Sequence, residues 1–232
     1  MEKKISIIIQ ARLSSKRFPG KVLNKIGNKT IIKILIDRLN YAKGISDVIF
    51  AIPNNKKNDK LNVYLKNIKK IKIYRGSENN VLSRYFGAAK KFKSDIIVRI
   101  TSDCPLIDPF MLTRIINYYK KNKYDYISNV RPRSFPDGLD IEVFSFETLK
   151  YAFENSKTKA DKEHVTKFMI RSKKILKFNF KNKKNFSKLR WTIDFKEDLF
   201  FLRSFLVNYS EKKYLDWKKL LTLYNKVKFK EY

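Results

Sequence analysis

Short apolar segments alternate with longer segments of helical periodicity in the first half of the chain. The apolar segments have the length of buried strands and cover residues 5–9, 48–52, 71–74, 96–100 and 124–128. Between them, apolar residues recur at the spacing of one helix face. These sets are Ile31, Ile32, Leu35 and Leu39; Leu61, Leu65 and Ile68; Val81, Leu82, Tyr85 and Ala89; and Met111, Leu112, Ile115 and Tyr119. The alternation predicts an α/β fold with a mostly parallel sheet and helices on both faces.

The pattern is less regular after Ser128. A turn sequence, RPRSFPDGLD, precedes a strand expected at residues 141–146. The remaining segments predict helices at 147–154 and 162–172, strands at 175–180 and 189–193, and helices from Glu197 and near Asp216. No internal repeat or linker divides the sequence, so we expect a single domain, residues 1–232, with residues 1–128 and 129–232 as its two halves.

The composition is that of a folded protein outside the membrane. Hydrophobic residues make up 43% of the 232 positions, which is enough for a core. The apolar part of the N-terminal MEKKISIII stops at Gln10, too short for an export signal, and no later stretch is long enough to span a bilayer. Cys104 is the only cysteine, which excludes an internal disulfide or a cysteine metal site. We expect a cytoplasmic protein without membrane insertion.

The formal net charge is +31, from 53 Lys and Arg against 22 Asp and Glu. A charge of this size favours a polyanionic partner such as nucleic acid. The lysines are nevertheless scattered along every segment, whereas a binding stripe is clustered and interleaved with aromatic residues. We therefore interpret the charge as diffuse and expect no nucleic-acid partner. A basic nucleic-acid-binding module stays an alternative, and steep weakening of binding with added salt would indicate it.

The first predicted strand ends in a basic loop within IIIQARLSSKRFPGKVLNK, residues 7–25. The loop contains Arg12, Ser14, Ser15, Lys16, Arg17, Gly20 and Lys21. Small residues let backbone N–H groups approach anionic oxygens, and the cations neutralise a nucleotide triphosphate. The sequence lacks the Gly-Lys-Ser/Thr ending of a P-loop and the triple glycine of a dinucleotide site. The alternative is a basic surface turn in a lysine-rich protein.

Two aspartates follow apolar segments at positions suited to a metal ion. Asp103 lies just past a predicted strand in IIVRITSDCPLID, and Asp194 ends the apolar segment of LRWTIDFKEDL. Mg²⁺ is commonly bound by one or two carboxylates and phosphate oxygens. Helix capping is the alternative, which suits Asp108 before Pro109 better than Asp103 but is equally open for Asp194. If the two segment ends are adjacent, Asp103 and Asp194 can converge on one ion.

Further polar residues in the second half could meet a substrate. In PDGLDIEVF, Asp140 and Glu142 point to the same face of an extended segment and could receive a polar substrate or a second metal. A simple turn explains Asp137 and Gly138 without any function. His164, the only histidine, is either structural or a contact for an acidic or hydroxylated substrate.

The motifs QARLSSKRFPGKVL, RGSENNVLSRY, VRITSDCPLIDP, FPDGLDIEVFSF, EHVT and LRWTIDFKEDL occur in this order. Together they resemble the SpsF-type cytidylyltransferase-like family of spore-coat polysaccharide proteins, from about Lys4 to about Phe205. That family is similar to the synthetases that activate acidic sugars as CMP conjugates. The resemblance implies a nucleotide-diphospho-sugar transferase domain, Rossmann-like and of the GT-A type, with residues 1–128 as the nucleotide-binding half and residues 129–232 as the substrate-facing half.

The resemblance also implies roles for individual residues. The triphosphate would be bound by Arg12, Ser14, Arg17 and Lys21, and the base would be recognised near Gln10 and Ala11. Arg75, Gly76 and Ser77 look like a second nucleotide-binding segment, and Asp103 and Asp194 look like Mg²⁺ ligands. Thr101 and Ser102 stand where the acidic-sugar synthetases typically have Gln-Gly, a departure that concerns base selectivity and sugar placement.

These observations predict a nucleotidyltransferase. We expect transfer of CMP from CTP to a hydroxyl or phosphate oxygen of a small acidic or hydroxylated glycan precursor, with release of pyrophosphate. Arg17 and Lys21 would offset charge on the leaving pyrophosphate, and Mg²⁺ on Asp103 and Asp194 would polarise the α-phosphate. A GT-A glycosyltransferase that uses a nucleotide sugar is the nearest alternative. The resemblance to acidic-sugar synthetases, which are commonly dimers, also suggests a homodimer.

Overall fold

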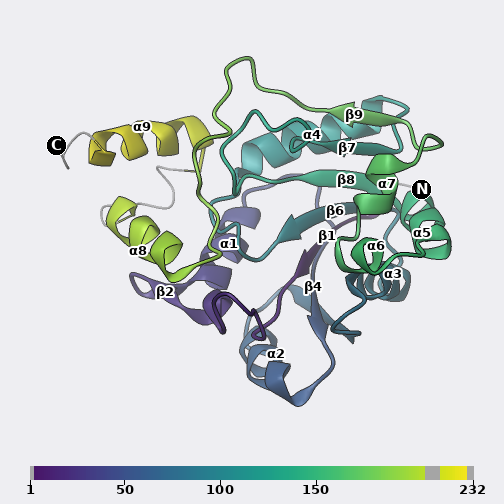
Figure 1. Ribbon diagram of the computed structural model, residues 1–232, viewed down its shortest axis with the longest axis horizontal. Helices are drawn as coiled ribbons and strands as arrows, with labels where there is room; N and C mark the ends of the chain where they lie inside the picture. Colours follow the sequence, from purple (N-terminus) through teal and green to yellow (C-terminus); the bar gives the residue numbers. More distant parts are fainter. Residues whose placement is uncertain (1–2, 207–214, 229–232) are drawn as a thin grey trace.

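The computed structural model describes residues 3–206 and 215–228, which form a mixed sheet between two layers of helices (Figure 1). The sheet has seven strands among the described residues, in the order β5-β4-β1-β6-β8-β7-β9. Their bounds are β1 Ile5–Gln10, β4 Asp47–Pro53, β5 Ile71–Gly76, β6 Ile96–Thr101, β7 Tyr126–Ser128, β8 Glu142–Ser145 and β9 Lys177–Asn179. All pairings are parallel except those of β8, which is antiparallel to β6 and to β7.

Alternate side chains of the sheet enter two separate hydrophobic cores. Ile7 and Ile9 of β1 point into the core covered by α1 (Ile31–Leu39), α2 (Asp59–Lys66), α4 (Pro109–Lys121), α8 (Lys196–Phe205) and α9 (Trp217–Lys228). Ile8 points the other way, into the core covered by α3 (Val81–Lys91), α5 (Phe146–Asn155) and α7 (Lys167–Arg171). The predicted α/β class, with helices on both faces of a mostly parallel sheet, is confirmed.

Short elements complete the fold. A two-stranded ribbon of β2 (Lys25–Ile26) and β3 (Lys29–Thr30) precedes α1, and two 3₁₀ turns lie at Lys21–Leu23 and Lys56–Asn58. The predicted cap at Asp108 is confirmed, because its Oδ1 accepts hydrogen bonds from Phe110 N and Met111 N, both at 2.8 Å. Asp108 Oδ2 also accepts from Trp217 N at 2.8 Å, which joins the start of α9 to the start of α4.

The single helix predicted at residues 162–172 is wrong, because two short helices occupy this region. The first, α6 (Lys159–Glu163), begins earlier than predicted, where the hydroxyl of Thr158 accepts from Asp161 N and the Asp161 carboxylate accepts from Thr158 N. Val165 then adopts a positive φ of 46°, which interrupts the helix before α7. The strand predicted at residues 189–193 is also wrong. This segment pairs with the sheet region through one isolated bridge, between Arg190 and Asp137.

Gly138 allows the 189–193 segment to pack closely. Its φ is +109°, and a Cβ there would lie 2.6 Å from Trp191 C and 2.7 Å from Thr192 N. Hydrogen bonds on either side hold the same contact, from Asp137 N to Leu189 O at 2.8 Å and from Trp191 N to Asp137 O at 2.6 Å. Trp191 and Ile193 are fully buried, so this segment is fixed by packing and turn contacts instead of a strand ladder.

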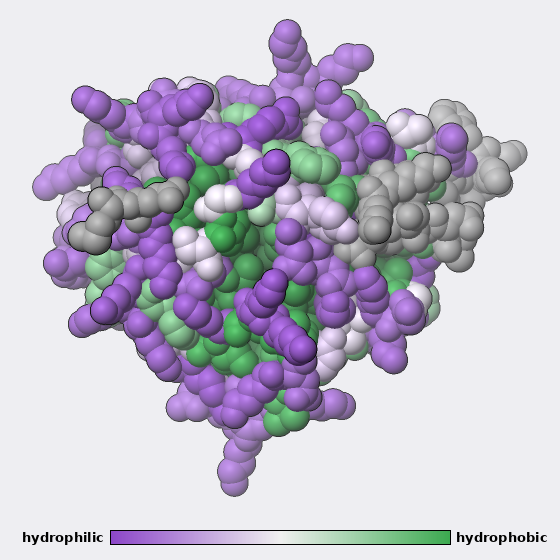
Figure 2. Space-filling model, turned by 180° about the vertical axis from the view of Figure 1, so that it is seen from behind, coloured by the Kyte–Doolittle hydropathy of each residue, from purple (hydrophilic) through white to green (hydrophobic). Residues whose placement is uncertain are grey.

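Hydrophilic side chains surround the face drawn in Figure 2, with a hydrophobic area at its centre. Hydrophilic residues are spread over the coloured part of this face and do not form a single stripe. Among the described residues, none of the helices has the length and apolar character needed to cross a membrane.

We predict that Gly138→Ala lowers the free energy of unfolding by about 3 kcal/mol or more, because the new methyl group meets backbone atoms that cannot move aside. Gly44→Ala is the matched control. Gly44 also has a positive φ, +75°, but a Cβ there would meet nothing within 4 Å, so we expect a cost of about 1 kcal/mol. Urea unfolding measures the free energy of unfolding of both variants. An equal loss of stability in the two would contradict the steric role of Gly138.

We predict a pH-dependent loss of stability in Arg171→Gln. Hydrogen bonds from Arg171 lower the pKa of the buried Asp161 carboxyl from 3.8 to about 2. A lowered folded-state pKa stabilises the fold above pH 3.8, and this stability is lost as the pH falls through 2. The variant should therefore be less stable than wild type at pH 7, with a difference that shrinks toward pH 2. Arg114→Gln removes an equal charge from an exposed position and should show no such trend.

Candidate active site

A cavity of about 630 Å³ lies at the carboxyl ends of β1 and β6, the edge where parallel sheets bind ligands. Segments distant in sequence form its walls: the end of β1 and the basic loop, the start of α3, the end of β6, helix α6, and the segment before α8. The residues are Gln10, Ala11, Arg12, Ser15, Lys16, Arg17, Lys21, Val22, Glu78, Asn79, Val81, Arg84, Thr101, Ser102, Asp103, Lys159, Glu163, His164 and Asp194.

Lys21 joins the two aspartates at one end of the cavity. The basic loop turns at Gly20, with φ 70°, into the 3₁₀ turn that carries Lys21. Its ammonium group donates to Asp103 Oδ2 at 2.9 Å, to Asp194 Oδ1 at 3.0 Å and to the carbonyl oxygen of Ile193 at 2.7 Å. Lys21 is only 8% exposed, so these acceptors replace the water that a surface lysine would keep. The structure therefore brings Asp103, Asp194 and Lys21 together.

Asp103 is fixed by its backbone as well as by its side chain. Its carbonyl oxygen accepts from Ile193 N at 2.9 Å and from Thr192 Oγ1 at 3.1 Å, which fastens the end of β6 to the segment before α8. Burial would raise the pKa of the Asp103 carboxyl. The attraction of the Lys21 ammonium and hydrogen bonds from Thr101 and Lys21 outweigh it, so the pKa lies below its usual value and the carboxylate is ionised.

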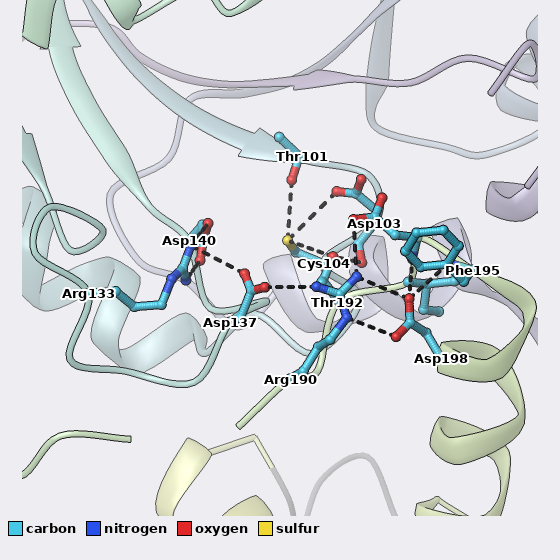
Figure 3. A network of polar contacts seen from close by, with 12 residues as sticks. Thr101, Asp103, Cys104, Arg133, Asp137, Asp140, Arg190, Thr192, Phe195 and Asp198 are labelled. Carbon is cyan, nitrogen blue, oxygen red and sulfur yellow. Dashed lines mark hydrogen bonds and ion pairs between the residues drawn. The ribbon is translucent and has the colours of Figure 1, made fainter. Parts of the chain in front are cut away.

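Asp194 is surrounded by cations. Oδ1 accepts from Arg17 at 2.8 Å in addition to Lys21, and Oδ2 accepts from Arg190 at 3.1 Å. The Arg17 guanidinium also lies over the Phe195 ring, 5.1 Å from its centroid. The alternative that Asp194 caps the following helix is wrong, because Phe195 holds the N-cap position of α8. Asp198 instead accepts from the backbone N–H groups of Asp194 and Phe195, as Figure 3 shows for Phe195.

The two carboxylates fit a divalent cation that a substrate also binds. In the described part of the chain, His, Cys, Asp and Glu form no group of three or more that could hold an ion. Asp103 and Asp194 can nevertheless reach one cation, because both already contact the single Lys21 nitrogen. Mg²⁺ is typically held by one or two carboxylates plus phosphate oxygens, and the donors here match that pattern.

Other residues of the basic loop divide between the cavity and the protein interior. Gln10, Ala11, Arg12, Arg17 and Thr101 line the cavity, and their binding of a nucleotide stays a prediction. Ser14 does not, because its hydroxyl donates to the Glu78 carboxylate, and the neighbouring Ser15 lines the wall instead. A triphosphate role for Ser14 stays a prediction.

The predicted second nucleotide segment lies outside the cavity wall. Arg75 donates to Asp59 Oδ1 at 2.6 Å and to the Asn55 carbonyl oxygen at 3.0 Å. The Ser77 hydroxyl accepts from Asn80 N at 3.0 Å, at the start of α3. Nucleotide binding by Arg75, Gly76 and Ser77 stays a prediction that the geometry does not support.

Sequence reasoning missed Arg84, which lies on α3 in the cavity wall. Arg84 is 2% exposed and donates through NH1 to the Ser77 carbonyl oxygen at 2.7 Å, whereas its buried Nε has no partner. No carboxylate pairs with it among residues 3–206 and 215–228. Burial lowers the pKa of Arg84 to about 10. Its place on the helix face of Val81, Tyr85 and Ala88 was a usable signal, since arginine is rarely buried without a partner.

Asp140 and Glu142 do not share an environment and line no part of the cavity. Both oxygens of Asp140 accept from Arg133, one of them at 2.8 Å. Glu142 is buried and accepts from Arg99 and from the Tyr126 hydroxyl. Substrate contact by Asp140 and Glu142 stays a prediction that the geometry does not support, because neither lines the cavity and each is paired with a different arginine. His164 differs, since it lines the cavity beside Lys159 and Glu163 at the end of α6.

Comparison with known proteins identifies the family to which this chain belongs. The profile of the cytidylyltransferase family matches residues 6–228. The uncharacterised protein MJ1063 of Methanocaldococcus jannaschii is 39% identical over 194 residues, which cover 82% of this chain and 78% of that protein. The spore coat polysaccharide biosynthesis protein SpsF of Bacillus subtilis is 29% identical over 236 residues, covering 96% of this chain and 94% of that protein.

A solved structure agrees in fold over nearly the full length. A cytidylyltransferase from Leptospira borgpetersenii superposes with a TM-score of 0.91 at 31% identity, over 97% of this chain and 95% of the other. The resemblance to SpsF-type proteins that the motifs predicted is confirmed. The chain belongs to the cytidylyltransferase family of nucleotidyltransferase enzymes.

Proposed function

We propose that this protein transfers CMP from CTP to a small glycan precursor and releases pyrophosphate. The observation that carries the proposal is the contact of Lys21 with both Asp103 and Asp194 beside the basic loop, within one cavity. Family membership supports CTP-dependent cytidylyl transfer, and the similarity to SpsF supports a precursor of a surface polysaccharide.

The basic loop supplies the charge that a triphosphate requires. Arg12, Lys16 and Arg17 line the same cavity as the aspartates, and the Arg17 side chain is 56% exposed, so it can turn toward a ligand. Positive groups at this end would offset the charge that develops on the departing pyrophosphate. Nucleotidyl transfer depends on such alignment and charge stabilisation more than on a covalent enzyme intermediate.

Asp103 and Asp194 would hold the divalent metal that enzymes of this family generally use. A bound Mg²⁺ would supply charge neutralisation and polarisation at the α-phosphate. The protein contributes a fixed pair of carboxylates, since Lys21 offsets their mutual repulsion, and the Ile193 N–H and the Thr192 hydroxyl hold the Asp103 main chain in place. Lys21 and Arg17 are the cations closest to these carboxylates that also line the cavity, so we assign them to the leaving group.

The part of the cavity wall formed by α3 and α6 suits an acidic or hydroxylated acceptor. Lys159 and Glu163 of α6 and the following His164 offer hydrogen-bonding groups there, and α3 adds Arg84. A buried guanidinium without a carboxylate partner gains a counter-ion or acceptor when a ligand binds. Arg84 therefore supports a ligand with an anionic or carbonyl oxygen at this wall. The cytoplasmic location and the homodimer stay predictions.

Two alternative functions differ from this proposal in their reaction products. A glycosyltransferase on this fold would use Asp103 to hold the metal of a nucleotide sugar and would release a nucleoside diphosphate. A nucleic-acid-binding module would consume no nucleotide, and membership of an enzyme family speaks against it.

The first test compares the four nucleoside triphosphates, each with Mg²⁺, by thermal unfolding. A ligand that binds only the folded protein raises its melting temperature, and we expect the largest rise with CTP. Incubation with CTP and candidate glycan precursors should then release pyrophosphate. The absence of any nucleotide-dependent shift, or release of nucleoside diphosphate from a nucleotide sugar in place of pyrophosphate from CTP, would contradict the proposal.

We predict that Asp103→Asn lowers turnover on the order of a hundredfold or more while the melting temperature without ligand stays close to wild type. The amide keeps the size of the side chain but removes the charge that binds the cation. Asp37→Asn is the control, since Asp37 pairs with Lys29 and Lys33 outside the cavity walls and should keep wild-type turnover. Measurement of pyrophosphate release tests both variants, and near-normal turnover in Asp103→Asn would remove its assignment as a metal ligand.

A further inference from the structure

We propose that Arg190, held by Asp198, is a positioning residue that fixes the orientation of the Asp194 carboxylate, with Oδ1 on the side of Lys21 and Arg17 and Oδ2 on the side of Arg190. This role rests on the proposed function, because it acts through a carboxylate that we assign to metal binding. Arg190 lies outside the cavity wall, so it would influence the reaction without touching the substrate.

The Arg190 guanidinium uses all of its nitrogens on carboxylates (Figure 3). Nε and NH2 donate to the two oxygens of Asp198 at 2.9 and 3.1 Å, which is a two-point contact. NH2 also donates to Asp194 Oδ2 at 3.1 Å, and NH1 donates to Asp137 Oδ2 at 3.2 Å. The planar group is therefore held in one orientation while it contacts Asp194.

The same pair fixes the Asp194 backbone. Asp198 Oδ2 accepts from Asp194 N at 2.7 Å and from Phe195 N at 2.9 Å, so Asp198 binds both Arg190 and the main chain at Asp194. The two carboxylate oxygens of Asp194 have different partners. Oδ1 accepts from Lys21 and Arg17, the cations that line the cavity, and Oδ2 accepts from Arg190. A rotation of the carboxylate would break contacts on both sides.

Arg190 also connects Asp194 to the rest of the fold. Its third partner, Asp137, belongs to the turn in which Gly138 packs closely against the backbone of residues 191–192. Arg133 contacts Asp137 and Asp140 in the same network but does not reach Asp194. Sequence patterns assign no function to Asp137 and Gly138 beyond forming a turn. Through Arg190, this turn helps to hold the Asp194 carboxylate. Lysine cannot replace Arg190 here, because a single ammonium lacks the fork that holds Asp198 at two points.

Residues that orient metal ligands typically change metal affinity 10- to 100-fold when they are removed. We expect Arg190→Gln to weaken Mn²⁺ binding, measured by electron paramagnetic resonance with CTP present, by about 10- to 100-fold. Turnover should fall, whereas the KM for CTP should change less, because the basic loop is intact. Arg190→Lys should restore only part of the affinity.

Arg133→Gln is the matched control, since it removes an arginine from the same network that has no contact with Asp194. We expect its Mn²⁺ affinity to stay close to wild type. The second control is the Asp194→Asn background. If Arg190 acts through Asp194, adding Arg190→Gln to Asp194→Asn should weaken Mn²⁺ binding no further. If Arg190→Gln does not fold, Asp198→Asn replaces it, because that change breaks the same two-point contact from the other side.

The outcomes separate this proposal from the proposed function. A folded Arg190→Gln protein with wild-type Mn²⁺ affinity would overturn the positioning role and leave the cytidylyltransferase assignment standing. A loss that is equally large in the Asp194→Asn background would also overturn it. Failure of the wild-type protein to bind Mn²⁺ in the presence of CTP would overturn the metal assignment itself, and this role with it.

Discussion

The ion contacts of Lys21 are the interaction on which the candidate active site depends. Two carboxylates that approach one point repel each other, and burial by itself would raise the pKa of the Asp103 carboxyl. Lys21 removes both problems, since its ammonium lies 2.9 Å from Asp103 and 3.0 Å from Asp194. It also donates to the Ile193 carbonyl oxygen, so the main chain next to Asp194 is fixed by the same group. The site can therefore be assembled before any ligand arrives.

The fold brings these groups together from three remote segments. β1 and β6 are neighbours in the sheet and run parallel, so the loops after them open at the same edge. The third segment is not a strand of the sheet. Residues 189–194 are held between the turn at Gly138 and the backbone of Asp103, by packing of Trp191 and Ile193 and by hydrogen bonds to both neighbours. Asp194 is thus placed by contacts that a regular strand would not make.

Charge in this protein acts on two scales. The formal net charge of +31 comes from lysine and arginine residues scattered along every segment of the sequence, and a charge of this sign attracts anionic substrates. Around the site, several acidic side chains meet arginine or lysine at short range, as Asp194 meets Lys21 in the cavity and Asp140 meets Arg133 outside it. Arg84 departs from this rule, because it is buried at the cavity wall without a carboxylate partner among residues 3–206 and 215–228. The Arg84 guanidinium donates instead to the backbone carbonyl oxygens of Ser77 and Glu78.

The sequence by itself determined the α/β class, the strands of the parallel half, the cap at Asp108 and the family, because periodicity, capping residues and ordered motifs are local properties of the chain. It also indicated the basic loop and the two aspartates. Only the tertiary structure decided that Lys21 contacts both aspartates, that Ser14 and Glu142 are bonded elsewhere, and that Arg84 and Arg190 take part in or support the site. Such pairings join residues up to 177 positions apart, as for Arg17 and Asp194. They depend on packing in three dimensions, which local patterns of polar and apolar residues do not encode.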